Sequence, residues 1–315
     1  MCDINKNKML MGIFNFSVDE YLEKLLVDKT TGKNIIFATD DYSNYGYDKQ
    51  AEMTPIAIRG MDANAIQPRI KKSLEEQARR TKVKAEVFTP AWICNRMNNH
   101  CDEEWFGRKD VFNKETDVDG KHTWTIIEGK IEFPKKKRWQ RYVDSKRLEI
   151  TCGEAPYIVS RYDTATGDVI PLPFRIGILD RKMRIVNENT DTEEDWLKWT
   201  YRAFQSVYGY EFQGDNLLIA RINLLLSFVE YMQDRLHRLP SKRELNKIIN
   251  IIVWNIWQMD GITGLIPFGK PTGSQVDLFD SAMFDNVSKV VLDECRIYDW
   301  RSKCSLTYNS MKRGK

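Results

Sequence analysis

Three acidic residues stand where strands of a parallel sheet are expected to end. Glu149 lies in the segment Arg-Leu-Glu-Ile-Thr, Glu211 closes Tyr-Gly-Tyr-Glu, and Asp260 follows an apolar run. Parallel α/β sheets bind ligands outside the carboxyl ends of their strands. An acid at such an end can accept both hydroxyls of a ribose, and an Asp in the following loop can accept a hydrogen bond from an adenine amino group. A capped strand end or a plain turn is the simpler interpretation of each residue alone.

Small residues follow the first of these strands. Cys152, Gly153 and Ala155 would let the backbone come close to a ligand, and the helix beyond them would offer N–H groups to a carboxylate or phosphate. A tight turn without a ligand is the alternative. A small-residue loop, then Glu211, then Asp260 is the arrangement needed to hold a ligand that contains adenosine.

Four segments in this order resemble the adenine-specific DNA methyltransferases of restriction–modification systems. Glu86-Val-Phe-Thr-Pro90 resembles the family's E-[VF]-[FY]-T-P segment, and residues 149–155 are similar to its D-P-A-C-G-S-G loop. Residues 208–223 resemble its G-x-E…A-x-x-N segment, and residues 255–261 its strand ending in G-D-x-L. The resemblance implies S-adenosylmethionine as cofactor. The cofactor-binding residues it implies are Glu86, Thr89, Pro90, Glu149, Cys152, Gly153, Glu211 and Asp260.

The chain departs from this family's pattern in its loop and in its catalytic motif. Glu149 stands for the usual Asp, and Glu154 and Ala155 stand for Ser and Gly. No N-P-P-Y/F motif follows Asp260. In the family those side chains accept the hydrogens of the adenine amine and stack on the flipped base. The only candidates for a substitute are Asp299, Trp300, Tyr308 and Asn309, so we expect methyl transfer to depend on a partner or to be lost.

Two basic segments are candidate contacts for DNA. The net charge of the chain is only +3, so local clusters must carry any such role. Residues 68–84 read as a basic helix, and residues 135–141 combine a run of cations with Trp139. A solvated helix face and an ordinary surface loop are the alternatives. The predicted nucleic-acid contacts are Lys71, Lys72, Arg79, Arg80, Lys135, Lys136, Lys137 and Arg138.

Alternating strand and helix patterns predict an α/β fold with a Rossmann-like methyltransferase sheet and an N-terminal arm. Strands are predicted at 34–39, 147–151, 208–212 and 248–258, and helices at 68–84, 193–207, 215–232, after Thr89 as N-cap with Pro90 in its first turn, and, briefly, from Pro240. We expect an arm over residues 1–84 and a methyltransferase-like domain over 85–315. Within that domain, residues 160–195 are interpreted as an insertion and residues 262–315 as an atypical C-terminal segment.

Composition indicates a cytoplasmic protein. No apolar run is long enough to span a membrane, and the N-terminal residues lack the hydrophobic segment of a signal peptide. The six cysteines are too irregularly spaced for a disulfide framework, so reduced thiols are expected. Cys94, His100 and Cys101 lie close in sequence, but no second half-site accompanies them and we predict no metal.

Three functional hypotheses follow. The first is a methyltransferase-like modification subunit of a prokaryotic restriction or phage-defence system, which binds S-adenosylmethionine and DNA and takes target recognition, catalysis or cleavage from a protein partner. The second is a non-catalytic subunit that senses the cofactor or grips DNA for a nuclease or helicase. The third is a complete methyltransferase that acts on another substrate.

Overall fold

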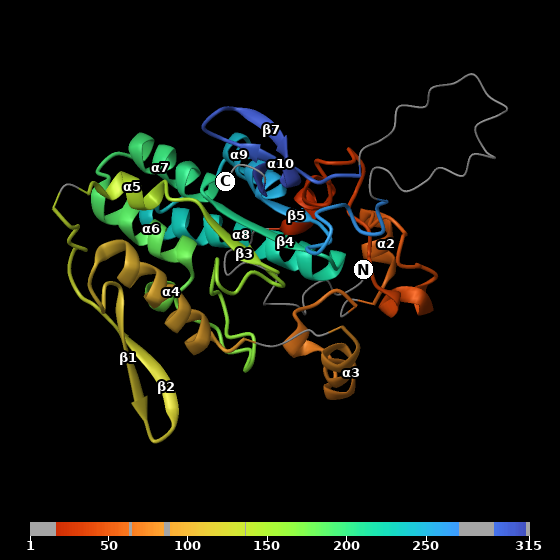
Figure 1. The fold of residues 1–315 in the computed structure, drawn as a ribbon, viewed down its shortest axis with the longest axis horizontal. Coiled ribbons are helices and arrows are strands. Elements are labelled where there is room, and N and C mark those ends of the chain that lie inside the picture. The colour runs from red at the N-terminus through yellow and green to blue at the C-terminus, as the bar shows by residue number, and fades with distance from the viewer. Residues whose placement is uncertain (1–16, 63–64, 85–88, 136, 271–292, 313–315) are drawn as a thin grey trace.

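A three-stranded parallel sheet forms the centre of the molecule (Figure 1). The computed structural model describes residues 17–62, 65–84, 89–135, 137–270 and 293–312. The sheet consists of β3 (Arg147–Ile150), β4 (Val207–Glu211) and β5 (Ile256–Gln258), in that order. Glu149 lies beside Gly209, and Glu211 lies beside Gln258. The predicted α/β fold with a parallel sheet is therefore confirmed, and the acids of β3 and β4 lie near the carboxyl ends of their strands.

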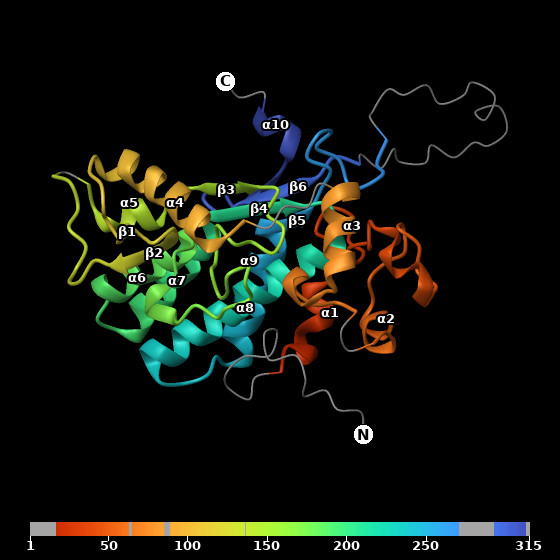
Figure 2. The same cartoon turned by 90° about the horizontal axis from the view of Figure 1, so that it is seen from below.

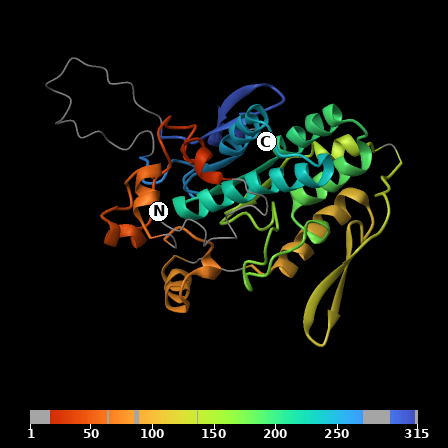
Figure 3. The ribbon, with the colours of Figure 1, turned by 180° about the vertical axis from the view of Figure 1, so that it is seen from behind.

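Helices cover one face of this sheet (Figure 2). They are α6 (Ile178–Asn189), α7 (Glu193–Gln205), α8 (Gly214–Leu236) and α9 (Lys242–Asn255). Helix α8 is buried continuously from Gly214 to Met232, as expected for a helix enclosed on all sides. Figure 3, seen from behind, shows this helix on the side towards the viewer, running from the N-terminal segments towards α7.

The C-terminal elements cover part of the opposite face. They are a hairpin of β6 (Arg296–Asp299) and β7 (Cys304–Thr307) and the short helix α10 (Tyr308–Lys312). Tyr208, Tyr210 and Trp257 are buried in a small cluster with residues of the hairpin. The hairpin does not cover β3, where Leu148 and Ile150 point to the same face but stay exposed.

The N-terminal segments pack directly on the helical layer. They contain η2 (Val18–Tyr21), α1 (Leu22–Leu25), η3 (Asp40–Tyr45), α2 (Pro55–Gly60), η4 (Arg69–Lys71) and α3 (Leu74–Lys84). Leu25, Ile35 and Phe37 belong to the same hydrophobic core as α8 and α9. Most of residues 34–39 are buried, but within the described ranges they make only isolated bridges, Val27 with Asn34 and Ile36 with Glu52. The strand predicted there is wrong as a sheet element, because Gln258 of β5 meets Ile36 with its side-chain amide rather than its backbone.

The remaining elements form a layer around α4 (Ala91–Phe106). The hairpin of β1 (Asn113–Val118) and β2 (Lys121–Ile126) and helix α5 (Trp139–Val143) lie here, and η5 (Leu172–Phe174) precedes α6. Arg181 of α6 and Asp102 of α4, both buried, form an ion pair that joins the two helices. Residues 160–195, interpreted from sequence as an insertion, therefore include a helix that contributes to the main core.

Two sequence predictions of element type or position are corrected. Residues 248–258 are not a strand: α9 extends to Asn255 and only the last three residues pair in β5. Leu245, Ile248, Ile249 and Ile252 recur at helical spacing, and Ser241 with Glu244 forms a capping box that starts the helix. Pro90, not Thr89, is the N-cap of α4, and no side chain caps that end.

The ranges that the structure describes contain no helix long and apolar enough to cross a membrane.

Candidate functional site

The small-residue loop after β3 is tied to the acid at the end of β4. Glu211 accepts hydrogen bonds from the N–H of Gly153 at 2.9 Å and of Gln213 at 3.1 Å. The Cys152 N–H donates to the Tyr210 carbonyl at 2.8 Å, which continues the contact between the strands beyond β3. Glu211 therefore fixes the position of the loop as well as marking the strand end.

The loop keeps a backbone shape that favours glycine. Gly153 has a φ of 50° and Ala155 a φ of 65°, both in the left-handed region. An L-residue pays a steric cost of about 1–2 kcal/mol there. Ala155 adopts this conformation at the position where the resembling family has glycine, so the turn is retained although the residue is not.

Glu149 carries a shielded carboxylate oxygen with no partner among the described residues. Its Oε1 accepts a hydrogen bond from the Tyr157 N–H at 3.3 Å, whereas Oε2 has none. Burial raises the pKa of Glu149 well above its usual value, although the amides of Tyr157 and Ile158 act in the opposite direction, and the nearby Glu211 raises it further. A cation at Oε2 would relieve this cost.

The Thr89–Pro90 segment reaches the same region. Thr89 accepts a hydrogen bond from Thr164 at 2.8 Å, and Asp163 accepts one from the N–H of Ala91 at 2.9 Å, so the loop after β3 holds the start of α4. Burial and then the Glu149 charge raise the pKa of Cys94, which places this thiol of α4 close to Glu149. Glu86 lies outside the described residues.

Tyr157 links these segments and was missed in the sequence. Its N–H contacts Glu149, and Met97 of α4 lies 3.2 Å from its hydroxyl. A Pro-aromatic pair just after the small-residue loop was the available signal. The structure therefore brings together Thr89, Pro90, Glu149, Cys152, Gly153 and Glu211.

Asp260 adopts the simpler of its two interpretations. Its Oδ1 accepts hydrogen bonds from the N–H groups of Ile262 at 2.8 Å and Thr263 at 3.3 Å, which closes a turn after β5. Gly261 packs so closely on the Tyr210 ring that a Cβ there would lie 2.8 Å from it. The turn is at the expected end of the sheet, but this oxygen is used by the protein itself.

The two candidate pairs for the missing motif lie at opposite ends of the sheet. Asp299 pairs with Lys146, next to the start of β3, and Trp300 donates to Asn255 at the end of α9. Asn309 instead donates to Thr263 in the Asp260 turn, and the Tyr308 ring lies 6.0 Å from that of Tyr210. Of the four residues, only Tyr308 and Asn309 are at the carboxyl end of the strands.

Glu154 does not project its charge into the loop. It accepts hydrogen bonds from the Arg69 N–H at 2.6 Å and from the Tyr162 hydroxyl, and it is buried. Burial raises its pKa. Glu154 thus attaches the N-terminal segments to the loop.

Two of the predicted DNA contacts are corrected. Lys72 and Arg80 are buried and pair with Asp215 at 3.1 and 2.9 Å, so they cannot contact phosphates in this conformation. Lys71 is exposed, and Arg79, also exposed, pairs with Asp41. Lys72 and Arg80 hold the arm on the protein because their acidic partner, Asp215, belongs to α8.

The second basic cluster remains at the surface. Lys135, Lys137 and Arg138 are exposed, and the Lys137 ammonium lies 4.6 Å from the Trp105 ring centre. Lys136 lies outside the described residues. Figures 1 and 2 place this segment, beside α5, at the opposite end of the molecule from α3.

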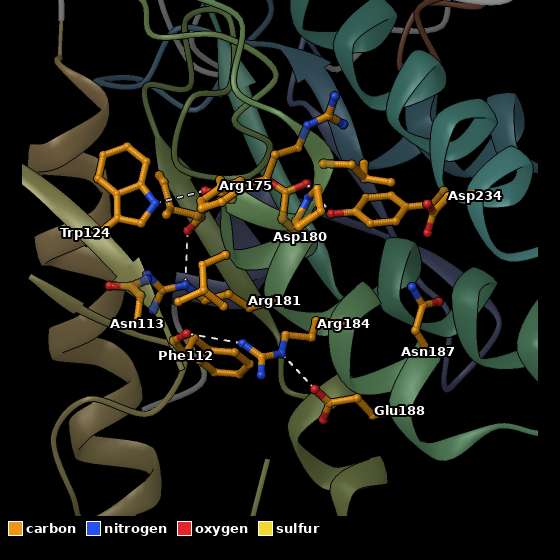
Figure 4. A pocket seen from close by; sticks show the side chains of 16 residues that line it. Phe112, Asn113, Trp124, Arg175, Asp180, Arg181, Arg184, Asn187, Glu188 and Asp234 are labelled. Atoms are coloured by element: carbon orange, nitrogen blue, oxygen red, sulfur yellow. Dashed lines mark hydrogen bonds and ion pairs between the residues drawn. The ribbon is translucent and has the colours of Figure 1, made fainter. Parts of the chain in front are cut away.

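Two cavities are large enough to be candidate ligand sites. One of about 500 Å³ lies along β3 and is lined by Glu149, Tyr157 and residues of α4. Another, of about 280 Å³, lies between α6 and the β1–β2 hairpin (Figure 4). Arg184 donates to Glu188 and to the Phe112 carbonyl, whereas Arg175 Nη1 has no partner among the described residues. The first cavity is the better candidate because it is lined by Glu149, which lies near the carboxyl end of β3.

In the part of the chain that the structure describes, no group of three or more His, Cys, Asp or Glu is placed to hold a metal ion. Comparisons with protein-family models, curated proteins and solved structures find no match to this chain.

Proposed function

We propose that this chain is a methyltransferase-like modification subunit of a prokaryotic restriction or phage-defence system, with a Rossmann-like sheet that binds S-adenosylmethionine. One observation carries the proposal: Thr89–Pro90, the loop 152–155 and the acids Glu149 and Glu211 converge at the carboxyl end of one parallel sheet. These are the segments on which the resemblance to adenine-specific DNA methyltransferases depends.

The residues present fit the two ends of such a cofactor unequally. The Oε2 of Glu149, unpartnered among the described residues, suits the ammonium of the methionine end, because a cation there would pair a carboxylate whose ionisation is disfavoured by burial. Glu211 can hold a ribose only if its bonds to Gly153 and Gln213 are shared or exchanged. When bound, the cofactor would supply an activated methyl group, and the chain would bind and orient it.

Methyl transfer itself, in this proposal, depends on a protein partner. Tyr308 and Asn309 lie at the right end of the sheet, but no Asn-Pro or Asp-Pro dipeptide follows Asp260 to supply the side-chain and carbonyl acceptors of the adenine amine. A group that accepts the hydrogens of the adenine amine must present a free oxygen close to the methyl group. We therefore expect the isolated chain to transfer no tritiated methyl groups to DNA; efficient transfer by it would contradict the dependence on a partner.

Calorimetric titration of S-adenosylmethionine tests the proposed binding. We expect the purified chain to bind the cofactor and Glu211→Gln to weaken binding at least about tenfold, because a hydrogen bond to a charged group contributes about 1.5–3 kcal/mol. Glu132→Gln, an exposed Glu remote from the loop, is the matched control and should bind as the wild type does.

Circular dichroism would verify that Glu211→Gln still folds, since Glu211 also supports the loop. Absence of heat in the wild-type titration at millimolar cofactor would contradict the proposal whatever the variants do.

A non-catalytic DNA-binding subunit is the second candidate. It is favoured by the exposed cluster of Lys135, Lys137 and Arg138 next to an aromatic side chain. Replacing all three by Ala should reduce the slope of log affinity against log salt by about 3 for duplex DNA, since each phosphate contact contributes about 0.9. Fluorescence anisotropy at several salt concentrations measures this slope.

The control for that experiment is a triple variant with equal charge loss elsewhere, Lys242→Ala, Arg243→Ala and Lys303→Ala, all at exposed positions. Equal losses in the two triple variants would show that net charge, not the 135–138 cluster, governs binding, and would remove this candidate.

A further inference from the structure

Strand β3 is an edge of the central sheet within the described residues, and its outer side is apolar and open. Leu148 is 44% exposed and Ile150 is 65% exposed. The Arg147 N–H donates to the Ser206 carbonyl on the β4 side. Because the backbone groups of a strand alternate, the N–H and C=O of Leu148 and Ile150 point away from β4. Strands of parallel sheets are usually buried on both faces, so this exposure is unusual.

The cavity of about 500 Å³ follows the same edge and contains polar atoms without partners. It is lined by all four residues of β3 and by Met97, Asn98 and Cys101 of α4. Arg147 Nε and Nη2, and Glu149 Oε2, are shielded from solvent and have no hydrogen-bond partner in the described ranges. Burial lowers the pKa of Lys182, and the Arg147 charge lowers it further, although Asp144 and Asp102 raise it. An acceptor for Arg147 is the missing group.

We propose that this edge is the docking site for a parallel β-strand of a separate polypeptide. That strand is apolar on the face of Leu148 and Ile150, and on the other face it carries a carboxylate that reaches Arg147. A strand satisfies the open backbone groups, the two aliphatic side chains and the guanidinium together, whereas a small ligand in the cavity would leave the backbone groups open. The inference rests on the proposed function in one respect: the added strand would run beside Glu149, where a partner could act on the bound cofactor.

Site-specific crosslinking in the cells that make this protein tests the docking site. The photoreactive residue p-benzoylphenylalanine is placed in the full chain at Ile150 or, as control, at Val118, an exposed position on the β1–β2 hairpin. We expect Ile150 alone to crosslink to a segment of another polypeptide that alternates apolar residues and contains Asp or Glu. The purified partner should slow hydrogen exchange of the Leu148 and Ile150 amides at least about tenfold.

A double variant that introduces charge at the two aliphatic positions makes the test quantitative. Leu148→Lys with Ile150→Lys should weaken association with that partner at least about tenfold, because each aliphatic side chain contributes through its burial, and Val118→Lys should not. Both positions are exposed in the free chain, so the variants should fold.

Crosslinking at Ile150 no stronger than at Val118, a crosslink to a second copy or to another segment of the same chain, or a partner that leaves the two amides unprotected would each overturn the inference. Slowed exchange without binding of S-adenosylmethionine would retain this docking site and reject the proposed function. Cofactor binding with unprotected amides would do the reverse.

Discussion

Replacing Asp215 by Asn is expected to lower the free energy of unfolding by about 3–5 kcal/mol. Asp215 is fully buried at the start of α8 and pairs with Lys72 and with Arg80, which is also fully buried. It also accepts a hydrogen bond from the Tyr42 hydroxyl at 2.9 Å. Removing the carboxylate leaves two buried cations without this partner, and that cost exceeds the loss of an ordinary hydrogen bond.

Urea unfolding followed by circular dichroism measures this loss, with Asp19→Asn as the control. Asp19 pairs with Arg59 at 3.0 Å on the surface, and pairs of that kind contribute about 0–1 kcal/mol. Similar losses in the two variants would contradict the assigned importance of the buried network.

The pH dependence of the same network has a definite sign. Burial alone would raise the pKa of Asp215, but Lys72 and Arg80 outweigh it and hold the pKa far below its usual range. A carboxylate with a lowered folded-state pKa stabilises the protein above its unfolded pKa, and this contribution is lost as the pH falls through the folded-state value. The difference between the wild type and Asp215→Asn should therefore persist at neutral pH and shrink only in acid.

This network also matters for the site. It holds the segment 69–81 against α8, and the Arg69 N–H in turn donates to Glu154 of the loop 152–155. Replacing Asp215 should therefore also weaken the binding of any ligand to the loop. Lys72 and Arg80, which were predicted from the sequence to contact phosphates, instead help to hold the site in position.

Local patterns predicted the elements that carry the site. The strand ending in Glu149 and the strand ending in Glu211 are both present, and so are the helices predicted at 193–207 and 215–232. Each combines a clear period with a turn or a cap, and the neighbouring residues reinforce it.

Tertiary partners explain the predictions that failed. The run of Ile and Val before Trp254 has high strand propensity, yet it packs as a helix because its apolar stripe meets α7 and α8. Asp215, the acid that pairs with the buried Lys72 and Arg80, is more than 130 residues away from them in sequence. A charge run alone could therefore not identify it as their partner. Tyr308 and Asn309 reach the site only through the C-terminal hairpin, which weak periodicity concealed.

The candidate site could be predicted as a set of strand ends, but the contacts between its residues could not. The sequence indicated that Glu149 and Glu211 lie at one end of the sheet, because parallel strands align their carboxyl ends. It could not indicate that Glu211 is engaged by the Gly153 N–H while Glu149 keeps an unpartnered oxygen. That difference makes Glu149 the more informative residue for experiments.

Glu149→Gln is expected to weaken S-adenosylmethionine binding at least about tenfold and to remove its pH dependence. In the wild type the pKa of Glu149 is raised, mainly by burial, and an ammonium binds only the ionised form. Affinity should therefore increase as the pH rises through that pKa, by up to about tenfold per pH unit, and then level off. The glutamine keeps an oxygen for the Tyr157 N–H, so the fold should persist. Titrations at about pH 5, 6 and 7, which run from just above the usual carboxyl pKa to neutrality, measure this pH dependence.

The stability of the unliganded chain should respond to this substitution in the opposite direction. A carboxyl whose folded-state pKa exceeds the unfolded value stabilises the protein most at low pH, and that stability is lost as the pH rises towards the folded-state pKa. Glu149→Gln removes this loss, so the free variant should be more stable than the wild type at neutral pH while binding the cofactor less well. A residue with a purely structural role would lose stability and binding together. Weaker binding accompanied by a lower melting temperature would therefore assign Glu149 to the structure of the loop rather than to the ligand.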